Sequence, residues 1–328
     1  MLWFWIIGGI SFFLTFISLP SWIHRAKETG FTGKDVHKKG VDVAELGGVT
    51  VILGVIFSLL IYVAVETFYL KGDSLSFLLA AIASILIATM IGMTDDMLGW
   101  RIGLNQREKV FLTLAVPIPL MVVNAGHSIM TLPIVGNVEF GLMYPMLIVP
   151  LGIIGATNGF NMLAGFNGLE AGMGVLIFSA LGYLAWQAGA TPAALIAVCF
   201  VFSLVAFLYY NWYPSKIFPG DVLTYPVGAG IAIVAILANI ERSAILIFIP
   251  YYIEFILKAR GRFKPEWTGE VLKDGTLTVR DKIFSVPHIC ISILKRIKGS
   301  SKENEVVKLI LAVEAVIAFI TVYSFNYF

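Results

Sequence analysis

Two adjacent carboxylates, Asp95 and Asp96, stand directly after a long apolar run and are the first side chains in the sequence that suggest chemistry. Two acids at a membrane boundary repel each other, and each costs free energy when it is poorly hydrated. A divalent cation or a shared proton would relieve that cost. A solvated helix end is the structural alternative, although two acids at a helix C-terminus oppose the helix dipole. The pair alone leaves both interpretations open.

A second polar segment lies between two apolar runs and carries three Asn and three Gly within residues 158–168. Asn158 and Asn161 are three positions apart, so they would offer their amide groups from one face of a helical turn. Glycine lets a backbone approach a ligand closely. A capped turn is the alternative, because Asn and Gly are also turn residues. Six such residues in 11 positions favour a binding site.

The segment 218–221, Phe-Pro-Gly-Asp, opens a further apolar run. Asp221 stands where a helix N-cap is expected, and capping alone would explain an Asp there about half the time. A helix N-terminus also favours a bound anion. Taken with Asp95, Asp96 and Asn161, Asp221 completes an all-oxygen ligand set, which suits Mg²⁺ or Mn²⁺ and does not suit zinc.

Charged side chains near these motifs are the remaining candidates. Lys109, 13 residues after Asp96, could meet an anion beside the acidic pair. His288 could donate to a phosphate or could lie at the membrane interface. Glu254 lies four residues after Pro250 in an apolar run, where a proline is expected to bend the helix and open a groove to lipid.

The elements that must position these residues are membrane-spanning helices. Apolar residues make up 58% of the 328 residues and charged residues only 13%, against about 25% charged in soluble domains. We predict about ten transmembrane helices, of which 109–125 and 143–157 could be tilted or broken. The apolar runs are 2–20, 47–70, 75–94, 109–125, 143–157, 169–188, 191–211, 222–240, 243–257 and 306–325.

The distribution of Lys and Arg predicts the orientation of these helices. Loops that follow odd-numbered runs hold 20 of these residues and loops that follow even-numbered runs hold two. By the positive-inside rule, the candidate site faces the cytoplasm and both termini lie outside. We expect a single integral membrane domain over 1–328. Its 258–304 loop would be cytoplasmic, with a small hairpin near 276–279 and an amphipathic helix over 288–297.

A transporter with a cation site is a rival interpretation of these patterns, but its polar residues should lie near the centres of the spans, and here they lie at span ends. The motifs instead resemble the polyprenyl-phosphate N-acetylhexosamine-1-phosphate transferases. The match rests on Asp95-Asp96 with Gly99, on 158–170, on 218–221 and on 34–48, in family order across nearly the whole chain. One departure is Ala44, where the family would have a Pro before Glu45.

The resemblance implies an activity and a branch of the family. The stretch 164–170, Ala-Gly-Phe-Asn-Gly-Leu-Glu, is similar to the branch that transfers GlcNAc-1-phosphate from UDP-GlcNAc to dolichyl phosphate, releasing UMP and starting lipid-linked glycan assembly for N-glycosylation. The bacterial cell-wall branch would carry Asp-Gly-x-Asp-Gly here and several His in the last loop. The short last loop suggests an archaeal enzyme of the cell membrane, and a eukaryotic relative would lie in the ER membrane.

The resemblance also implies a role for each site residue. Asn161 and Asp221 match the ligands of a Mg²⁺ ion, with Mn²⁺ as an alternative. Asp95 and Asp96 match an acidic pair thought to orient or deprotonate the acceptor phosphate, and Lys109 and His288 match residues around the pyrophosphate. The remaining substrate-binding candidates are Lys34, Glu45, Asn158, Asn167, Gly168 and Glu170.

Partners follow from the same resemblance. We expect UDP-GlcNAc, dolichyl or another polyprenyl phosphate, and the lipid bilayer, with no nucleic acid. Another UDP-N-acetylhexosamine or undecaprenyl phosphate would be an alternative substrate. The chain could act alone or as a homodimer.

Overall fold

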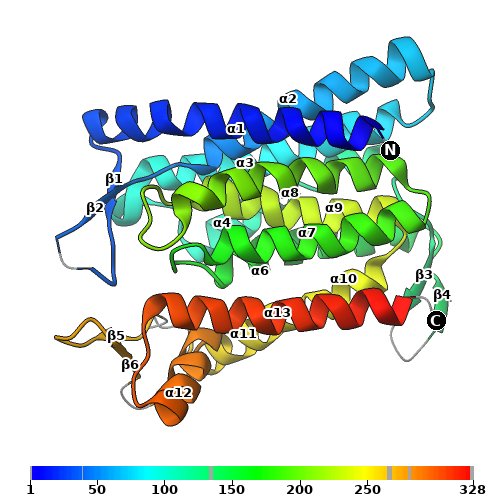
Figure 1. The fold of residues 1–328 in the computed structure, drawn as a ribbon. Helices are drawn as coiled ribbons and strands as arrows, with labels where there is room; N and C mark the ends of the chain where they lie inside the picture. The colour runs from blue at the N-terminus through cyan, green and yellow to red at the C-terminus, as the bar shows by residue number, and fades with distance from the viewer. Residues whose placement is uncertain (1, 39, 133–135, 264–267, 280–281, 326–328) are drawn as a thin grey trace.

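The computed structural model describes residues 2–38, 40–132, 136–263, 268–279 and 282–325, and in these ranges the chain is a bundle of long helices (Figure 1). Eight helical segments are long and apolar enough to cross a membrane, which confirms an all-α polytopic membrane protein. They are α1 (Leu2–Thr29), α2 (Gly48–Val65) with the π-helical turn η1 (Glu66–Leu70), α3 (Leu75–Ile102), η2 (Tyr144–Ile148) with α6 (Val149–Met162), α7 (Leu169–Gln187), α8 (Thr191–Asn211), α9 (Asp221–Ala238) and α13 (Glu303–Phe325).

Two of the ten predicted spans are broken into shorter helices. The 109–125 run forms α4 (Gln106–Thr113) and α5 (Ile118–Val122), and Pro117 and Pro119 account for the break. The 243–257 run forms α10 (Glu241–Ile247) and α11 (Ile249–Arg260), with the break at Phe248, two residues before Pro250. The 143–157 run, by contrast, is one continuous helical segment.

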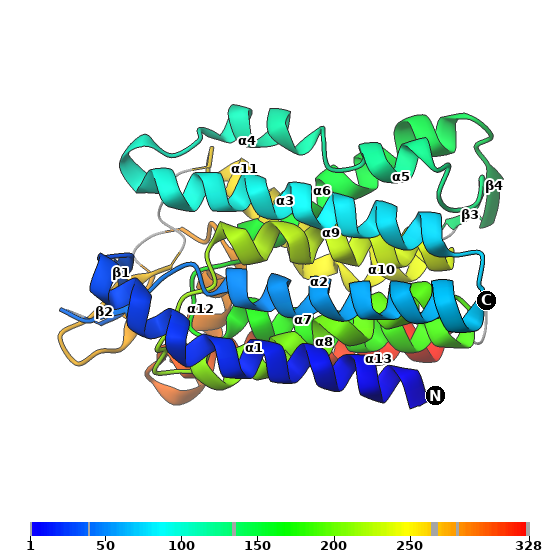
Figure 2. The same ribbon diagram turned by 90° about the horizontal axis from the view of Figure 1, so that it is seen from above.

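Helix α9 is the centre of the bundle, with 89% of its residues buried, whereas only 28% of the most apolar window of α1 is buried. Figure 2 shows α9 enclosed by its neighbours, with α1 and α4 on opposite outer sides. Glycines allow the close packing: a Cβ added at Gly92 of α3 or Gly228 of α9 would overlap backbone atoms of the facing helix. Small residues at a helix interface let backbones approach in this way.

The start of α1 and the end of α13 lie at one end of the bundle in both views, and α12 (Val286–Lys298) and the hairpin segments β1, β2, β5 and β6 lie at the other (Figures 1 and 2). The strands form three antiparallel pairs: β1 (Thr32–Lys34) with β2 (Asp42–Ala44), β3 (Ile129–Leu132) with β4 (Gly136–Glu139), and β5 (Glu270–Val271) with β6 (Leu277–Thr278). Residues 264–267 and 280–281 of the 258–304 loop lie outside the described residues. The orientation in the membrane stays a prediction.

Candidate active site

Asp95 and Asp96 stand in the last regular turn of α3, immediately before Gly99 interrupts the helix with a φ of +69°. Glycine adopts this left-handed conformation without steric cost, and the turn brings the following chain back toward the acidic pair. Asp95 Oδ1 accepts the backbone N–H of Leu104 at 2.7 Å. The glycine of the motif therefore shapes the environment of Asp95.

Asp96 caps the N-terminus of α9, although it lies 125 positions before the first residue of that helix. Its Oδ1 accepts the N–H of Asp221 at 2.9 Å and its Oδ2 accepts the N–H of Val222 at 2.8 Å. These are donors that a helix leaves unpaired at its first turn, and a carboxylate also complements the positive end of the helix dipole. Gly220 precedes them with a φ of +72°, and a Cβ at Gly220 would collide with the Asp96 carboxylate.

Lys109 joins the acidic pair to α9. Its ammonium lies 2.6 Å from Asp95 Oδ2 and 2.9 Å from Asp221 Oδ2. Helix α4 places it there, and that helix is started by Asn105 and Glu108 in a reciprocal capping box. The single ammonium bridges two carboxylates that would otherwise repel each other.

Asn161 completes this cluster from the last turn of α6. Its Nδ2 donates to Asp221 Oδ2 at 3.2 Å, and its Oδ1 accepts the hydroxyl of Thr224 at 3.0 Å. Carboxylate oxygens of Asp95, Asp96 and Asp221 lie within 4.8 Å of one another. Three clustered carboxylates with one bridging ammonium form an oxygen-rich, negatively charged donor set, which fits a hard divalent cation.

A polar pocket of about 400 Å³ adjoins this cluster. Its charged and amide lining comes from four parts of the chain: Lys34, Asp35, Glu45, Asn161, Asn167, Glu170, Asn211, Asp221 and Lys258. Burial raises the pKa of Glu45 above its ordinary value. A pocket lined by both cationic and acidic groups can hold a ligand that carries both phosphate and hydroxyl groups.

The loop between α1 and α2 reaches the pocket through backbone pairing with the segment before α9. Gly47 N–H donates to Phe218 O at 3.0 Å and Phe218 N–H donates to Ala44 O at 2.7 Å. Ala44 is fully buried in β2. These bonds fix the loop at the position where the family pattern would have a proline.

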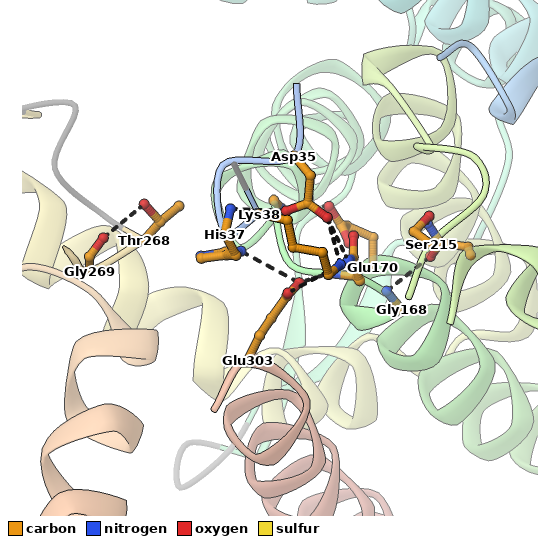
Figure 3. A network of polar contacts seen from close by, with 12 residues as sticks. Asp35, His37, Lys38, Gly168, Glu170, Ser215, Thr268, Gly269 and Glu303 are labelled. Atoms are coloured by element: carbon orange, nitrogen blue, oxygen red, sulfur yellow. Dashed lines mark hydrogen bonds and ion pairs between the residues drawn. The ribbon is translucent and has the colours of Figure 1, made fainter. Parts of the chain in front are cut away.

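A polar cluster shares Asp35 and Asn167 with the pocket lining and joins the loop between α1 and α2 to α13 (Figure 3). Asp35 accepts hydrogen bonds from Lys38 Nζ at 2.7 Å and from Asn167 Nδ2 at 3.2 Å. Glu303, at the start of α13, accepts the N–H of Asn167 at 2.9 Å and lies 3.5 Å from His37 Nδ1. Burial alone would raise the pKa of Asp35, but its hydrogen bonds with Lys38, the His37 N–H and Asn167 lower it overall.

The segment 163–168 is held by neighbouring polar groups. Glu170 is buried and its Oε1 accepts the N–H of Gly165 at 2.6 Å. Gly168 donates to Asn211 Oδ1 at 3.1 Å and has a φ of +84°. This arrangement presents Asn167 at the edge of the pocket.

An apolar groove of about 580 Å³ begins beside the polar pocket. It lies between α6, α9, α10 and α11, and its lining includes Leu151, Phe248, Tyr252 and Phe255. Leu151 is 59% exposed and Phe255 is 50% exposed, so the groove opens on the outer surface of the bundle. A long hydrocarbon chain could enter it directly from lipid.

The structure brings most of the predicted site residues together. Asp95, Asp96, Lys109, Asn161 and Asp221 form the acidic cluster, and Lys34, Glu45, Asn167 and Glu170 line the pocket, with Gly168 beside them. Two residues lie elsewhere. Asn158 lines the apolar groove, and its Nδ2 donates to the Thr113 hydroxyl and to the Ile154 carbonyl. His288 is buried at the start of α12 and is not among the described residues that line the polar pocket.

The polar residues of the site that were not predicted include Lys258, Asp35, Glu303 and Asn211. Lys258 stands four residues after Glu254, which is the spacing of an ion pair on one helix face, so the sequence held a signal for it. Asp35 lies within the Lys34 motif. Glu303 lies at the start of an apolar run, and an acid there is already explained by its favourable interaction with the helix dipole, so the sequence held no separate sign of a role in the site.

Residues 77–239 match glycosyl transferase family 4. The chain is 38% identical over 319 residues to a protein of Saccharolobus solfataricus, with 95% of this chain and 94% of that protein covered. That protein carries the provisional name UDP-N-acetylglucosamine–dolichyl-phosphate N-acetylglucosaminephosphotransferase. An enzyme of the same name from Dictyostelium discoideum is 29% identical over 298 residues, covering 77% of this chain and 72% of the enzyme.

A further relative is the phospho-N-acetylmuramoyl-pentapeptide-transferase of Halalkalibacterium halodurans, 30% identical over 253 residues, covering 73% of this chain and 76% of that enzyme. These matches show that the chain belongs to glycosyl transferase family 4, a family of membrane phosphotransferases, and they confirm the resemblance found in the motifs.

Proposed function

We propose that this protein transfers GlcNAc-1-phosphate from UDP-GlcNAc to dolichyl phosphate, or to a closely related polyprenyl phosphate, and releases UMP. The observation that carries the proposal is the meeting of a polar pocket and a lipid-accessible apolar groove beside one acidic cluster. The names of the archaeal and Dictyostelium relatives support this choice of substrates. Another UDP-N-acetylhexosamine or undecaprenyl phosphate would use the same site.

The reaction joins two anions, so the site must reduce their repulsion. An oxygen of the lipid phosphate attacks the β-phosphorus of UDP-GlcNAc, and the bond from that phosphorus to the bridging oxygen breaks as UMP leaves with the electron pair. Asn161 and Asp221 would hold Mg²⁺, or Mn²⁺ in its place, beside Asp95 and Asp96. When bound, this ion would spread the charge of the phosphate oxygens.

The contacts of the two adjacent acids favour direct attack by the lipid phosphate over a covalent enzyme intermediate. Both oxygens of Asp96 already accept N–H groups of α9, and Asp95 accepts from Leu104 and pairs with Lys109. A carboxylate that attacked phosphorus would have to give up these bonds. Lys109 instead supplies a fixed positive charge next to the reacting phosphates.

The partners and location follow from the same arrangement. The nucleotide sugar enters the polar pocket from water and the polyprenyl chain enters the groove from lipid. We place the protein in the cell membrane as a multi-pass protein, or in the ER membrane if the source is eukaryotic. A homodimer stays a prediction.

The test is release of UMP by purified protein in detergent with Mg²⁺, dolichyl phosphate and a panel of UDP-sugars. We expect UDP-GlcNAc to be the best donor, and Asp221→Ala to lower turnover by about 100-fold or more while the protein stays folded. Asp73→Ala, at an exposed acid on the opposite end of the bundle, is the matched control. Full activity of Asp221→Ala would remove the metal assignment.

A further inference from the structure

Lys258 is a charged residue of the polar pocket that neither the motifs nor the roles above explain. It lies in the last turn of α11, and its side chain is 15% exposed. Its ammonium donates to the backbone carbonyl of Met162, the last residue of α6, and lies 3.2 Å from Glu254 Oε1. A cation at this position also complements the negative end of the α6 dipole.

Met162 borders both cavities, because it lines the polar pocket and the apolar groove. Lys258 contacts Met162 and lines the polar pocket, while Tyr252 and Phe255, up to two turns earlier on the same helix, line the groove. Helix α11 therefore carries aromatic side chains along the groove and ends with a positive charge where the groove meets the pocket.

We propose that Lys258 binds the phosphate of the lipid acceptor. The proposal rests on the function proposed above, and it assigns a substrate-binding residue to that site. A prenyl chain that fills the groove must place its phosphate at the end of the groove, beside Met162. The Lys258 ammonium meets it there as a flexible point charge with three donors, suited to a phosphate that must approach the reacting phosphorus.

Glu254 is the positioning residue for this lysine. It is 1% exposed, and its Oε2 accepts the N–H of Val286, the first residue of α12, at 2.6 Å. Its Oε1 faces Lys258 one turn along the helix. Glu254 thus holds the ammonium near Met162 and ties α11 to α12.

Phosphate is also present in the nucleotide, so the experiment compares two ligands in the absence of turnover. Binding of geranyl phosphate and of UDP to purified protein in detergent is measured for the natural protein, Lys258→Met and Lys258→Arg. Lys298→Met is the matched control, because Lys298 is 55% exposed on α12 and pairs with Glu305. We expect Lys258→Met to weaken geranyl phosphate about 10-fold or more, since a charge-assisted hydrogen bond is lost, and to leave UDP within about twofold.

Lys258→Arg keeps the charge and is expected to stay within about threefold of the natural protein for geranyl phosphate. In steady-state assays the KM for the lipid acceptor should rise in Lys258→Met while the KM for UDP-GlcNAc is unchanged. A purely structural role of Lys258 would not separate the two constants. If the unpaired Glu254 prevents Lys258→Met from folding, the double variant Glu254→Gln with Lys258→Met removes that buried charge and is used instead.

Two results would overturn the assignment. Equal affinity of Lys258→Met and the natural protein for geranyl phosphate would remove Lys258 from the acceptor site, and weakened UDP with unchanged geranyl phosphate would assign Lys258 to the nucleotide. If the natural protein itself binds neither ligand, the proposed function fails. The binding data thus separate that failure from an error about Lys258.

Discussion

At the scale of single residues, the acidic cluster depends on Lys109, because this ammonium bridges Asp95 and Asp221. Without it, three carboxylates within 4.8 Å of one another must be neutralised by other means. A divalent cation is the obvious substitute for the missing positive charge.

We predict that Lys109→Met lowers UMP release by about 100-fold or more and makes folding stability depend more strongly on Mg²⁺. The measurement is the melting temperature in a Mg²⁺ titration, with Asp221→Ala as the variant that should lose the Mg²⁺ effect. A melting temperature independent of Mg²⁺ in both the natural protein and Lys109→Met would contradict a metal site here.

Asp35 gives a second prediction, on pH. Its hydrogen bonds lower its pKa in the folded protein below the ordinary value of 3.8, so the ionised form stabilises the fold. This stabilisation is fully present above the unfolded pKa and is lost as pH falls through the folded pKa.

We expect Asp35→Asn to lower the free energy of unfolding by about 1–3 kcal/mol at pH 7, because the ion pair with Lys38 is lost. The difference between variant and natural protein should shrink as the pH is lowered below 3.8. Thermal melts of both proteins at several pH values measure this difference. A difference that stays constant down to the lowest pH would show that Asp35 is not ionised in the fold.

At the scale of elements, the site depends on how closely α3 approaches α9. Gly92 lies one turn before Asp96, and a Cβ at Gly92 would overlap the carbonyl group of Asp221. Any separation of the two helices would pull Asp96 from the N–H groups that it caps.

Gly92→Ala should therefore destabilise the protein by about 1–3 kcal/mol and lower UMP release by more than about 10-fold, since small displacements of reacting groups are costly. The control is Gly9→Ala in α1, where an added Cβ meets no atom within 4 Å. Equal activity of the two variants would show that the approach of α3 to α9 does not set the geometry of the site.

The positions of the helices could be predicted from the sequence, but the contacts between them could not. Apolar runs located all eight intact spans, and Pro117, Pro119 and Pro250 marked the two runs that break. Motif residues at span ends indicated a common site. The partner of each residue could not be predicted, because Asp96 and Asp221 are 125 positions apart and only helix packing brings them together. For His288, the sequence predicted a position near the pyrophosphate. In the structure, His288 is not among the described residues that line the polar pocket.

At the scale of the whole molecule, the ends of the bundle differ in character. The start of α1 and the end of α13 lie at one end, and α12 and the β5–β6 hairpin lie at the other (Figure 1). The acidic cluster lies where α3 ends and α9 begins. The Lys and Arg residues of the sequence concentrate in the loops that follow odd-numbered runs, which predicts that the site faces the cytoplasm.

Single cysteines test this orientation in a background without Cys199 and Cys290. Asp73→Cys lies in the exposed turn before α3, and Ser300→Cys lies in the exposed turn between α12 and α13. With a membrane-impermeant maleimide applied to right-side-out vesicles, we expect position 73 to be labelled and position 300 to be protected until the membrane is opened. The opposite pattern would invert the assigned orientation.

Met162 stands alone as the residue shared by the described linings of the two cavities. Met162 therefore marks the boundary between the apolar groove and the polar pocket. The water-soluble nucleotide sugar and the lipid phosphate can meet at this boundary, so neither substrate has to cross the bilayer. We expect turnover to proceed without the alternating inward and outward openings that a carrier requires.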